Sequence, residues 1–465
     1  MSVATVAERA DAGRAARRRV ARSALGTWDP AARTHDPVDT LALQATSRVP
    51  ELVPIRHGRM AASPFAHFRG AALAMALDLA TRPSTGLTVQ LCGDAHLSNF
   101  GGFASPERSL VFDLNDFDET LPGPFEWDVA RLAASMVVAA RDRGFDAAVA
   151  RTAVLDTVAM YRTAMHEFAA QRDLEVWYAT LDVEALAARL ADSLSAKARK
   201  RSERTIAKAR AKDQLRAAAK LTEVVDGELR FRSDPPLLVP MSELAADAGV
   251  PAERVVETIT ESLESYRSTL QPDRVHLLDG YHLRDVARKV VGVGSVGTRA
   301  WVVLLTGRDD ADPLVIQVKE AQASVLEAVL PRSVYDNHGQ RVVEGQRLLQ
   351  ASSDILLGWK GTVGLDGYDR DFYMRQLWDW KASAAVESME PGTLQTYGRA
   401  CGWTLARAHA RSGDRIAIAA YLGTGTRFDE AMARWASAYA DQNDRDHAAL
   451  VAAIEDGRLS ATFGV

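Results

Sequence analysis

Residues 91–132 read LCGDAHLSNFGGFASPERSLVFDLNDFDETLPGPFEWDVARL, the stretch with the densest polar chemistry in the chain. Two short β-prone runs, at 88–92 and 109–114, are each followed by a loop that carries acidic or amide side chains. We expect the two runs to form adjacent strands, which would bring these side chains together. Neighbouring carboxylates repel one another unless a cation lies between them, and oxygen ligands that include a carboxamide suit Mg²⁺ or Mn²⁺ better than Zn²⁺. The stretch therefore predicts a site for a hard divalent ion.

The spacing of polar residues in these loops is typical of phosphoryl transfer. Asp94 is followed by Asn99 five residues later, and Asp116 and Asp118 come after the second run. In phosphotransferases a loop Asp accepts the proton of the substrate hydroxyl, an Asn binds metal, and a downstream Asp completes the metal site. We therefore expect Asp94 to be the catalytic base. Asn99 and Asp116 would be metal ligands, with Asp118 or Asp113 assisting, whereas turn capping is the alternative interpretation.

The same stretch resembles the catalytic core of aminoglycoside phosphotransferase-like members of the protein-kinase-like superfamily in three motifs, GDAHLSN, NDFDET and GPFEWDVARL. The resemblance implies that Asp94 is the catalytic Asp, that His96 is the inner His of the loop, and that Asn99 binds metal. It further implies that Asp116 is the second metal ligand, with Asp113 as a competing candidate. Asp128 would steady the catalytic loop from the following helix.

A second group of motifs begins at Gly292, Gly294 and Gly297, which lie between two β-prone runs. A dinucleotide site would need a helix directly after the glycines, and the following residues 300–305 are strand-like. A strand, a glycine loop and a second strand are the kinase arrangement, in which small residues let the backbone close over nucleotide phosphates. We expect the three glycines to bind nucleotide, with a tight hairpin as the alternative.

Lys319 ends the apolar run PLVIQVK and is the candidate phosphate-binding lysine. A lysine at the end of a buried strand is costly to leave unpaired. It therefore needs ATP phosphates, a helix carboxylate, or both. Glu344, in a helix-like segment at 338–351, is the expected partner, and Glu327 is the second choice.

The motifs stand in the reverse of the usual kinase order, because the glycine loop normally precedes the catalytic Asp. Either one motif is spurious or the chain is circularly permuted, which is physically permissible because packing depends on which elements touch. The segment TLARAHARSGD (404–414) resembles the helix that comes immediately before the catalytic loop in aminoglycoside phosphotransferases. Its place near the end of the chain favours permutation.

We therefore expect an α+β protein with a kinase-like bilobal fold, circularly permuted and carrying extra helices. Residues 1–280 would form most of the larger lobe, with the catalytic loop at 89–130 and a helical insert. Residues 281–385 would form a smaller β-rich nucleotide-binding lobe, and residues 386–465 would complete the larger lobe. The chain also resembles a bacterial family catalogued only as a domain of unknown function and grouped with kinase-like folds, in RMAASPFAHFRG, KVVGVGSVGTRAW and RVVEGQR.

Composition narrows the class of protein. The 465 residues are 47% apolar and 25% charged, a composition typical of globular proteins. The formal net charge of −5 argues against nucleic acid as the main partner. No apolar run approaches the ~18–20 residues of a membrane span and the start lacks a secretory segment, so we expect a cytoplasmic protein without a membrane partner. The two cysteines, Cys92 and Cys401, exclude a disulfide framework. Cys92 stands where the kinase-like proteins usually have His.

The leading interpretation is an ATP- and Mg²⁺-dependent phosphotransferase that acts on an unknown small-molecule or protein hydroxyl. Nucleotidyl transfer would use the same residues with ATP reversed. A metal-dependent phosphoester hydrolase would need the acidic loops and His96 but neither Lys319 nor the glycines. A kinase relative that binds nucleotide without catalysis is the third alternative. The arginines of RHGRMAASPFAHFRG (56–70) could clamp an anionic substrate or brace the acidic loops.

Overall fold

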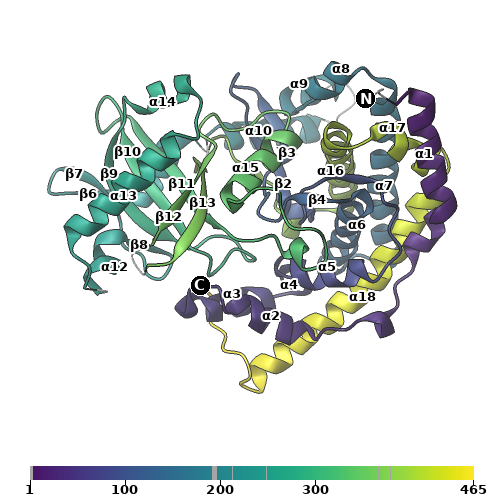
Figure 1. The fold of residues 1–465 in the computed structure, drawn as a ribbon, viewed down its shortest axis with the longest axis horizontal. Helices are drawn as coiled ribbons and strands as arrows, with labels where there is room; N and C mark the ends of the chain where they lie inside the picture. Colours follow the sequence, from purple (N-terminus) through teal and green to yellow (C-terminus); the bar gives the residue numbers. More distant parts are fainter. Residues whose placement is uncertain (1–3, 191–195, 212, 248, 365–366, 378) are drawn as a thin grey trace.

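A computed structural model describes residues 4–190, 196–211, 213–247, 249–364, 367–377 and 379–465. The protein is mixed α+β, and every strand pairing in the described residues is antiparallel. A six-stranded sheet with its own helices lies to the left in Figure 1, and a larger, mainly helical part lies to the right. No helix among these residues is long and apolar enough to span a membrane.

The helices and strands of the described residues have the following bounds. The helices are α1 (Val6–Arg19), α2 (Pro37–Ala45), α3 (Val53–Ala61), α4 (Pro64–Gly70), α5 (Ala72–Ala80), α6 (Phe125–Asp142), α7 (Ala147–Ala170), α8 (Asp173–Tyr178), α9 (Val183–Leu190), α10 (Ala196–Arg210), α11 (Gln214–Leu221), α12 (Met241–Asp247), α13 (Ala252–Arg267), α14 (Pro272–Leu278), α15 (His338–Leu349), α16 (Pro391–Ser412), α17 (Arg415–Leu422) and α18 (Arg427–Glu455). The strands are β1 (Thr88–Leu91), β2 (Phe100–Ala104), β3 (Leu110–Leu114), β4 (Leu121–Pro124), β5 (Leu181–Asp182), β6 (Thr222–Val225), β7 (Glu228–Phe231), β8 (Leu238–Pro240), β9 (His282–Lys289), β10 (Ala300–Thr306), β11 (Pro313–Ala321), β12 (Gly358–Val363), β13 (Asp369–Gln376) and β14 (Ala382–Ser383).

The six-stranded sheet has the order β12-β13-β11-β10-β9-β8. Its central strands are continuous apolar runs because both faces are covered. Val302 and Leu304 pack with α11, whereas Val303 and Leu305 pack with Tyr266 of α13, as the alternation of side chains along a strand requires. The segment 214–280, which we expected in the larger lobe, therefore packs with the β-rich part, because the sheet needs a helix on each face.

The larger part is built around α6. Every residue of α6 from Phe125 to Ala140 is buried, so this helix is surrounded by other elements on all sides. Helix α16 packs closely along α7, and two glycines of α16 make the approach possible: a Cβ at Gly398 or Gly402 would clash with Thr157 of α7. This packing fixes the position of α16, which carries Arg407 and His409. These two side chains contact Asp113 and Asp128 in the region of the acidic loops.

The close α16–α7 approach makes a stability prediction. We expect Gly402→Ala to lower the free energy of unfolding by about 1–3 kcal/mol, because the added methyl meets the backbone of α7 and cannot be accommodated without a shift. Gly392→Ala, near the start of the same helix, is the matched control: nothing lies within 4 Å of its added methyl. That change should be neutral or stabilising by up to about 1 kcal/mol. Guanidinium unfolding of both variants measures the difference, and equal effects would contradict the prediction.

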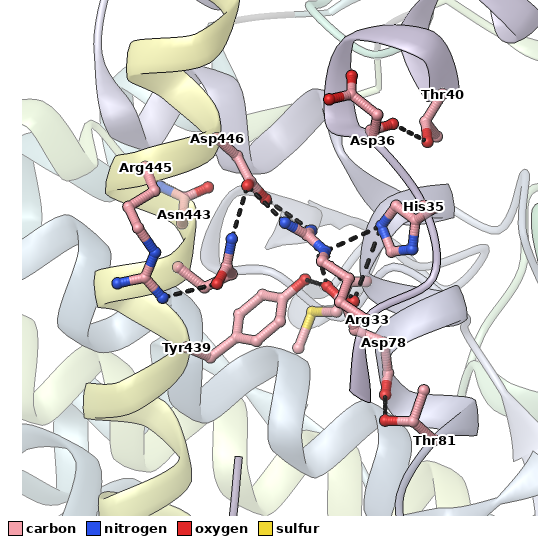
Figure 2. Close-up of polar contacts among 12 residues, drawn as sticks. Arg33, His35, Asp36, Thr40, Asp78, Thr81, Tyr439, Asn443, Arg445 and Asp446 are labelled. Atoms are coloured by element: carbon pink, nitrogen blue, oxygen red, sulfur yellow. Dashed lines mark hydrogen bonds and ion pairs between the residues drawn. The ribbon is translucent and has the colours of Figure 1, made fainter. Parts of the chain in front are cut away.

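The N-terminal segment is attached to the larger part by a buried ionic cluster (Figure 2). Arg33 donates to both carboxylate oxygens of Asp78, at 3.0 and 2.9 Å, and of Asp446, at 2.6 and 2.7 Å. The Tyr439 hydroxyl also donates to Asp78, at 2.9 Å. The side chains of Arg33, Asp78 and Asp446 are 8%, 0% and 6% exposed. One guanidinium thus joins the residues before α2 to α5 and α18.

Two segments far apart in sequence meet at the start of β1. The Gln90 amide donates to the Ser412 hydroxyl, at 3.2 Å and across 322 residues of sequence. A Cβ at Gly413 would lie 2.8 Å from the Thr88 carbonyl oxygen. The end of α16 therefore lies directly beside the beginning of β1.

Candidate functional site

The loop after β1 is held in place by backbone contacts. The amides of Cys92 and Gly93 donate to the carboxylate of Asp128, at 2.8 and 3.1 Å. Gly93 has a φ of +84°, and a Cβ there would clash with Glu119. The Asp94 carbonyl oxygen accepts from the His96 amide, at 2.8 Å, and from Asn99 Nδ2, at 2.7 Å. These contacts fix the positions of the loop side chains.

Asp128 is in turn held by α16. His409 Nε2 lies 3.2 Å from Asp128 Oδ2, and Nδ1 of the same ring lies 2.9 Å from the Tyr161 hydroxyl. All three side chains are buried. His409 was not predicted as a site residue, although it lies in the segment 404–414, which resembles the helix that comes immediately before the catalytic loop in aminoglycoside phosphotransferases.

Asp94 is held by an arginine of α6. Arg131 Nε donates to Asp94 Oδ1, and Arg131 Nη2 donates to the Phe68 carbonyl oxygen at 2.9 Å. Burial raises the pKa of Asp94 above its ordinary value, and the charge of Arg131 opposes that rise. Because Arg131 is bound at Oδ1, Oδ2 remains the oxygen of Asp94 that can accept from a ligand.

His96 lies beside Asp94 as a neutral ring. Its Nε2 is 3.6 Å from Asp94 Oδ2, too far for a hydrogen bond, and its Nδ1 is buried with no partner among the described residues. Burial lowers the pKa of His96 well below its ordinary value, and the nearby charges of Arg131 and Arg69 lower it further.

The second acidic loop holds Lys319. Asp118 Oδ2 lies 3.1 Å from Lys319 Nζ, and Asp118 Oδ1 accepts from the Tyr373 hydroxyl at 2.6 Å. Burial alone would raise the pKa of Asp118, but Lys319 and Tyr373 outweigh it and the pKa falls below its ordinary value. Burial, followed by the charge of Asp118, raises the pKa of Asp116. The charges of Lys319 and Arg375 oppose that rise, although neither cation forms an ion pair with Asp116.

The partner of Lys319 is a correction to the sequence analysis. Glu344 pairs with Arg347 at 3.0 Å on its own helix, and Lys319 pairs with Asp118 instead. The residue that α15 directs at the acidic loop is Arg341, which donates to the carbonyl oxygens of Thr120 and Asp118 at 2.7 and 2.8 Å. Helix α15 therefore contacts the second acidic loop through an arginine that donates to backbone carbonyl oxygens. It does not supply the carboxylate that we expected beside Lys319.

Asp113, the alternative metal ligand, has a structural partner. It forms a buried ion pair with Arg407 of α16. Its carboxylate also accepts from the amides of Leu114 and Ala351, at 2.8 and 3.0 Å. Asp113 does not line the pocket described below, so Asp116 is the better placed of the two acids.

We expected the two acidic loops to follow adjacent strands, but they do not. Strand β1 pairs with β4, whereas β3 pairs with β2 in another sheet. The loops nevertheless meet, because β2 follows directly after the first loop and the Asn115 amide donates to the Asn99 carbonyl oxygen at 3.0 Å. Strand β2 itself was not expected from its glycine-rich sequence FGGFA.

A pocket of about 210 Å³ lies where these loops meet the rest of the chain. Its lining includes four of the predicted site residues of the acidic loops, together with His96: Asp94, Asn99, Asp116 and Asp118. The predicted glycine loop reaches the same pocket through Gly292 and Gly294. Gly297, Lys319 and Glu344 do not line it. Lys319 instead pairs with Asp118, which does line the pocket.

The glycine turn lies between β9 and β10, as the strand–glycine loop–strand pattern predicts. It is fixed to the N-terminal segment rather than free. The Val49 amide donates to the Gly297 carbonyl oxygen at 2.8 Å, and Arg59 Nη1 donates to that of Gly292 at 2.6 Å. A Cβ at Gly294 would lie 3.1 Å from the Arg69 carbonyl oxygen, so the small residue permits the close approach.

The donor set suits a hard divalent ion in part. Within the described residues, no three His, Cys, Asp or Glu side chains are gathered so that they could hold a metal ion by themselves. Mg²⁺ usually takes only one or two carboxylates, with phosphate and water oxygens as its other ligands. Among the described residues Asp116 has no ion-pair partner at hydrogen-bond distance, and Asn99, whose Nδ2 is bound to the Asp94 carbonyl oxygen, retains its carbonyl Oδ1. These two side chains, with Asp118 beside them, fit such an ion.

Glu119 is a pocket residue that the sequence analysis missed. Burial raises its pKa to about 7, although Oε2 accepts from the Val325 amide at 2.7 Å. Its position directly after Asp118 was the available signal. Arg131 was also missed, and its place three residues after Asp128 on one helix face was the corresponding signal.

Comparison with known proteins places the chain in a family. No curated protein and no solved structure matches the chain. One sequence family matches residues 48–453, which include both acidic loops, the glycine turn and α16. The chain therefore belongs to the bacterial family described as "Uncharacterized protein conserved in bacteria (DUF2252)".

Proposed function

We propose that this protein is an ATP- and Mg²⁺-dependent phosphotransferase that acts on a hydroxyl group. The observation that carries the proposal is the shared pocket: the acidic loops and the glycine turn line one pocket, although they lie far apart along the chain. The direct contact between Lys319 and Asp118, across 201 residues of sequence, joins the second acidic loop to strand β11 of the sheet that carries the glycine turn. Positioning and charge neutralisation are what phosphoryl transfer requires of a protein.

In this proposal Asp94 accepts the proton of the attacking hydroxyl through Oδ2, while Arg131 holds Oδ1. The hydroxyl oxygen forms a bond to the γ-phosphorus of ATP, and the bond from that phosphorus to the bridging oxygen breaks, releasing ADP. Asn99, Asp116 and Asp118 would hold Mg²⁺, which neutralises phosphate charge when bound. His96, a neutral ring, lies beside Asp94 with its Nε2 3.6 Å from Oδ2.

The fold that accompanies this function would be a circularly permuted kinase-like one. Two contacts support it: the end of α16 lies beside the start of β1, at the Gln90–Ser412 hydrogen bond, and His409 of α16 supports Asp128. Joining α16 to β1 would place the glycine turn and Lys319 before the catalytic loop, in the ordinary kinase order.

The test is Mg²⁺-dependent binding of ATP, measured by calorimetry on the full chain. We expect binding with Mg²⁺ and at least about tenfold weaker binding by Lys319→Met, because Asp118 loses the cation that orients it. Glu344→Gln, which removes a half-buried ion pair within α15 that does not line the pocket, is the control and should bind as the wild type does. No binding by the wild type, or unchanged binding by Lys319→Met, would contradict the proposal. Transfer of a γ-phosphate label rather than an α-phosphate label would distinguish phosphoryl from nucleotidyl transfer.

Phosphoester hydrolysis is the second candidate, and one observation favours it. Lys319 is engaged by Asp118 and does not line the pocket, so the acidic loops could act without a nucleotide. Metal-dependent release of phosphate from p-nitrophenyl phosphate that survives Lys319→Met but not Asp94→Asn would support it. Absence of that release from the wild type would reject it.

A further inference from the structure

Three arginines line the pocket together with the acidic loops: Arg48, Arg56 and Arg69. They come from the N-terminal segment, where Arg48 follows α2, Arg56 lies on α3 and Arg69 lies on α4. Among the described residues, none of the three has a carboxylate within ion-pair distance. A pocket wall that carries three such cations needs an explanation beyond the acidic loops.

Arg56 is buried and has two guanidinium nitrogens without a partner among the described residues. Its side chain is 1% exposed, and Nη2 donates to Gln44 Oε1 at 3.1 Å and to the Gly70 carbonyl oxygen at 3.0 Å. Its Nε and Nη1 are buried and have no partner among the described residues. A buried charged donor without an acceptor is costly, so a ligand that accepts from these nitrogens would be bound strongly.

Arg48 and Arg69, which line the same pocket, each also have a nitrogen without an acceptor in the described part of the chain. Arg48 Nη1 donates to the Val296 carbonyl oxygen, but its Nε is buried without a partner, as is Arg69 Nε. Burial lowers the pKa of Arg48 to about 10, and burial together with the charge of Arg48 lowers that of Arg56 well below its ordinary value. The guanidinium fork matches the geometry of phosphate and carboxylate groups. An oxyanion of a ligand would supply acceptors for these nitrogens.

The position of Arg69 favours the acceptor over the nucleotide. In the proposed function, the metal ligands and the glycine turn bind the phosphate chain of ATP. The charge of Arg69 acts on Asp94 and His96, the residues placed at the attacking hydroxyl. We propose that Arg48, Arg56 and Arg69 bind an oxyanion of the phosphate acceptor, so that the acceptor is a small alcohol carrying a phosphate or carboxylate group. The acceptor assignment rests on the proposed function, whereas the oxyanion site does not.

The experiment titrates inorganic phosphate into the full chain by calorimetry, without nucleotide or metal. We expect the wild type to bind, and Arg56→Gln and Arg69→Gln each to bind at least about tenfold more weakly. Arg69 is only half-buried, so its variant should fold even where Arg56→Gln does not. Arg14→Gln removes a distant exposed arginine and should leave binding unchanged. No binding by the wild type, or equal binding by Arg69→Gln, overturns the oxyanion site.

A second titration, in the presence of Mg²⁺ and a non-hydrolysable ATP analogue, separates the two sources of the anion. Phosphate that binds alongside the analogue supports the acceptor assignment. Displacement of phosphate by the analogue would overturn that assignment. It would show that the arginines bind the terminal phosphate of the nucleotide. Phosphate binding by a protein that binds no nucleotide rejects the proposed function while the oxyanion site stands.

Discussion

Asp94→Asn should lower the rate of ADP release from Mg²⁺-ATP by about 10²–10⁴-fold, with water as the acceptor in a coupled assay. The amide keeps the size of the side chain and an oxygen for Arg131, but it cannot accept a proton from the attacking group. Because Asp94 is not among the proposed metal ligands, the affinity for Mg²⁺-ATP should change little. The variant therefore separates the chemical step from nucleotide binding.

Two controls accompany this measurement. Ser98→Ala changes a residue of the same loop that does not line the pocket, and it should retain the wild-type rate. The unfolding transition of Asp94→Asn should be checked, since Arg131 is 3% exposed and loses its ionic partner. A folded Asp94→Asn protein with a rate within about tenfold of the wild type would show that Asp94 is not the base.

Arg33→Met should destabilise the protein by about 3–5 kcal/mol, because it leaves Asp78 and Asp446 buried without a cation. The predicted loss can be followed by tryptophan fluorescence during guanidinium unfolding, with Trp435 of α18 near the cluster. Arg14→Met is the matched control, since its pair with Asp11 is 44% and 71% exposed. The control should change stability by less than about 0.5 kcal/mol. Equal effects of the two changes would contradict the role given to Arg33.

The loss of stability caused by Arg33→Met should also depend on pH. Burial raises the pKa of Asp78 from 3.8 to about 6 in the folded protein, so folding favours the protonated carboxyl. That contribution to stability is present below the unfolded pKa and is lost as the pH rises through the folded pKa. Without Arg33 the pKa of Asp78 should rise further. The destabilisation by Arg33→Met should therefore be larger at about pH 8 than at about pH 5.

Local sequence was sufficient for two strands beside the acidic loops and for the glycine turn. The runs at 88–92 and 109–114 became β1 and β3, and the glycine turn lies between two strands as its flanking residues predict. These features depend on a few adjacent residues: apolar runs of the right length, and polar or glycine residues after them. Strand β2 was missed because FGGFA has no strand preference of its own, and pairing with β3 supplies the reason for its conformation.

Partner choice could not be predicted in the same way. Glu344 was a reasonable partner for Lys319 by charge and by helix position, yet Asp118 occupies that place. Similarly, the sequence favoured Asp116 as a metal ligand but left Asp113 as a competing candidate, and the ion pair of Asp113 with Arg407 of α16 appears only in the structure. Each pair joins residues hundreds of positions apart, and nothing in the local pattern distinguishes one acid from another.

The sequence by itself determined the chemical inventory of this protein: the acids, amide and histidine of the two loops, the glycine turn, and the lysine at the end of a buried strand. Only the tertiary structure decided which of these charges are neutralised within the protein and which remain for a ligand. The physical reason is that side-chain type and short-range backbone preference are local properties. Burial and the nearest countercharge depend on segments that packing brings together.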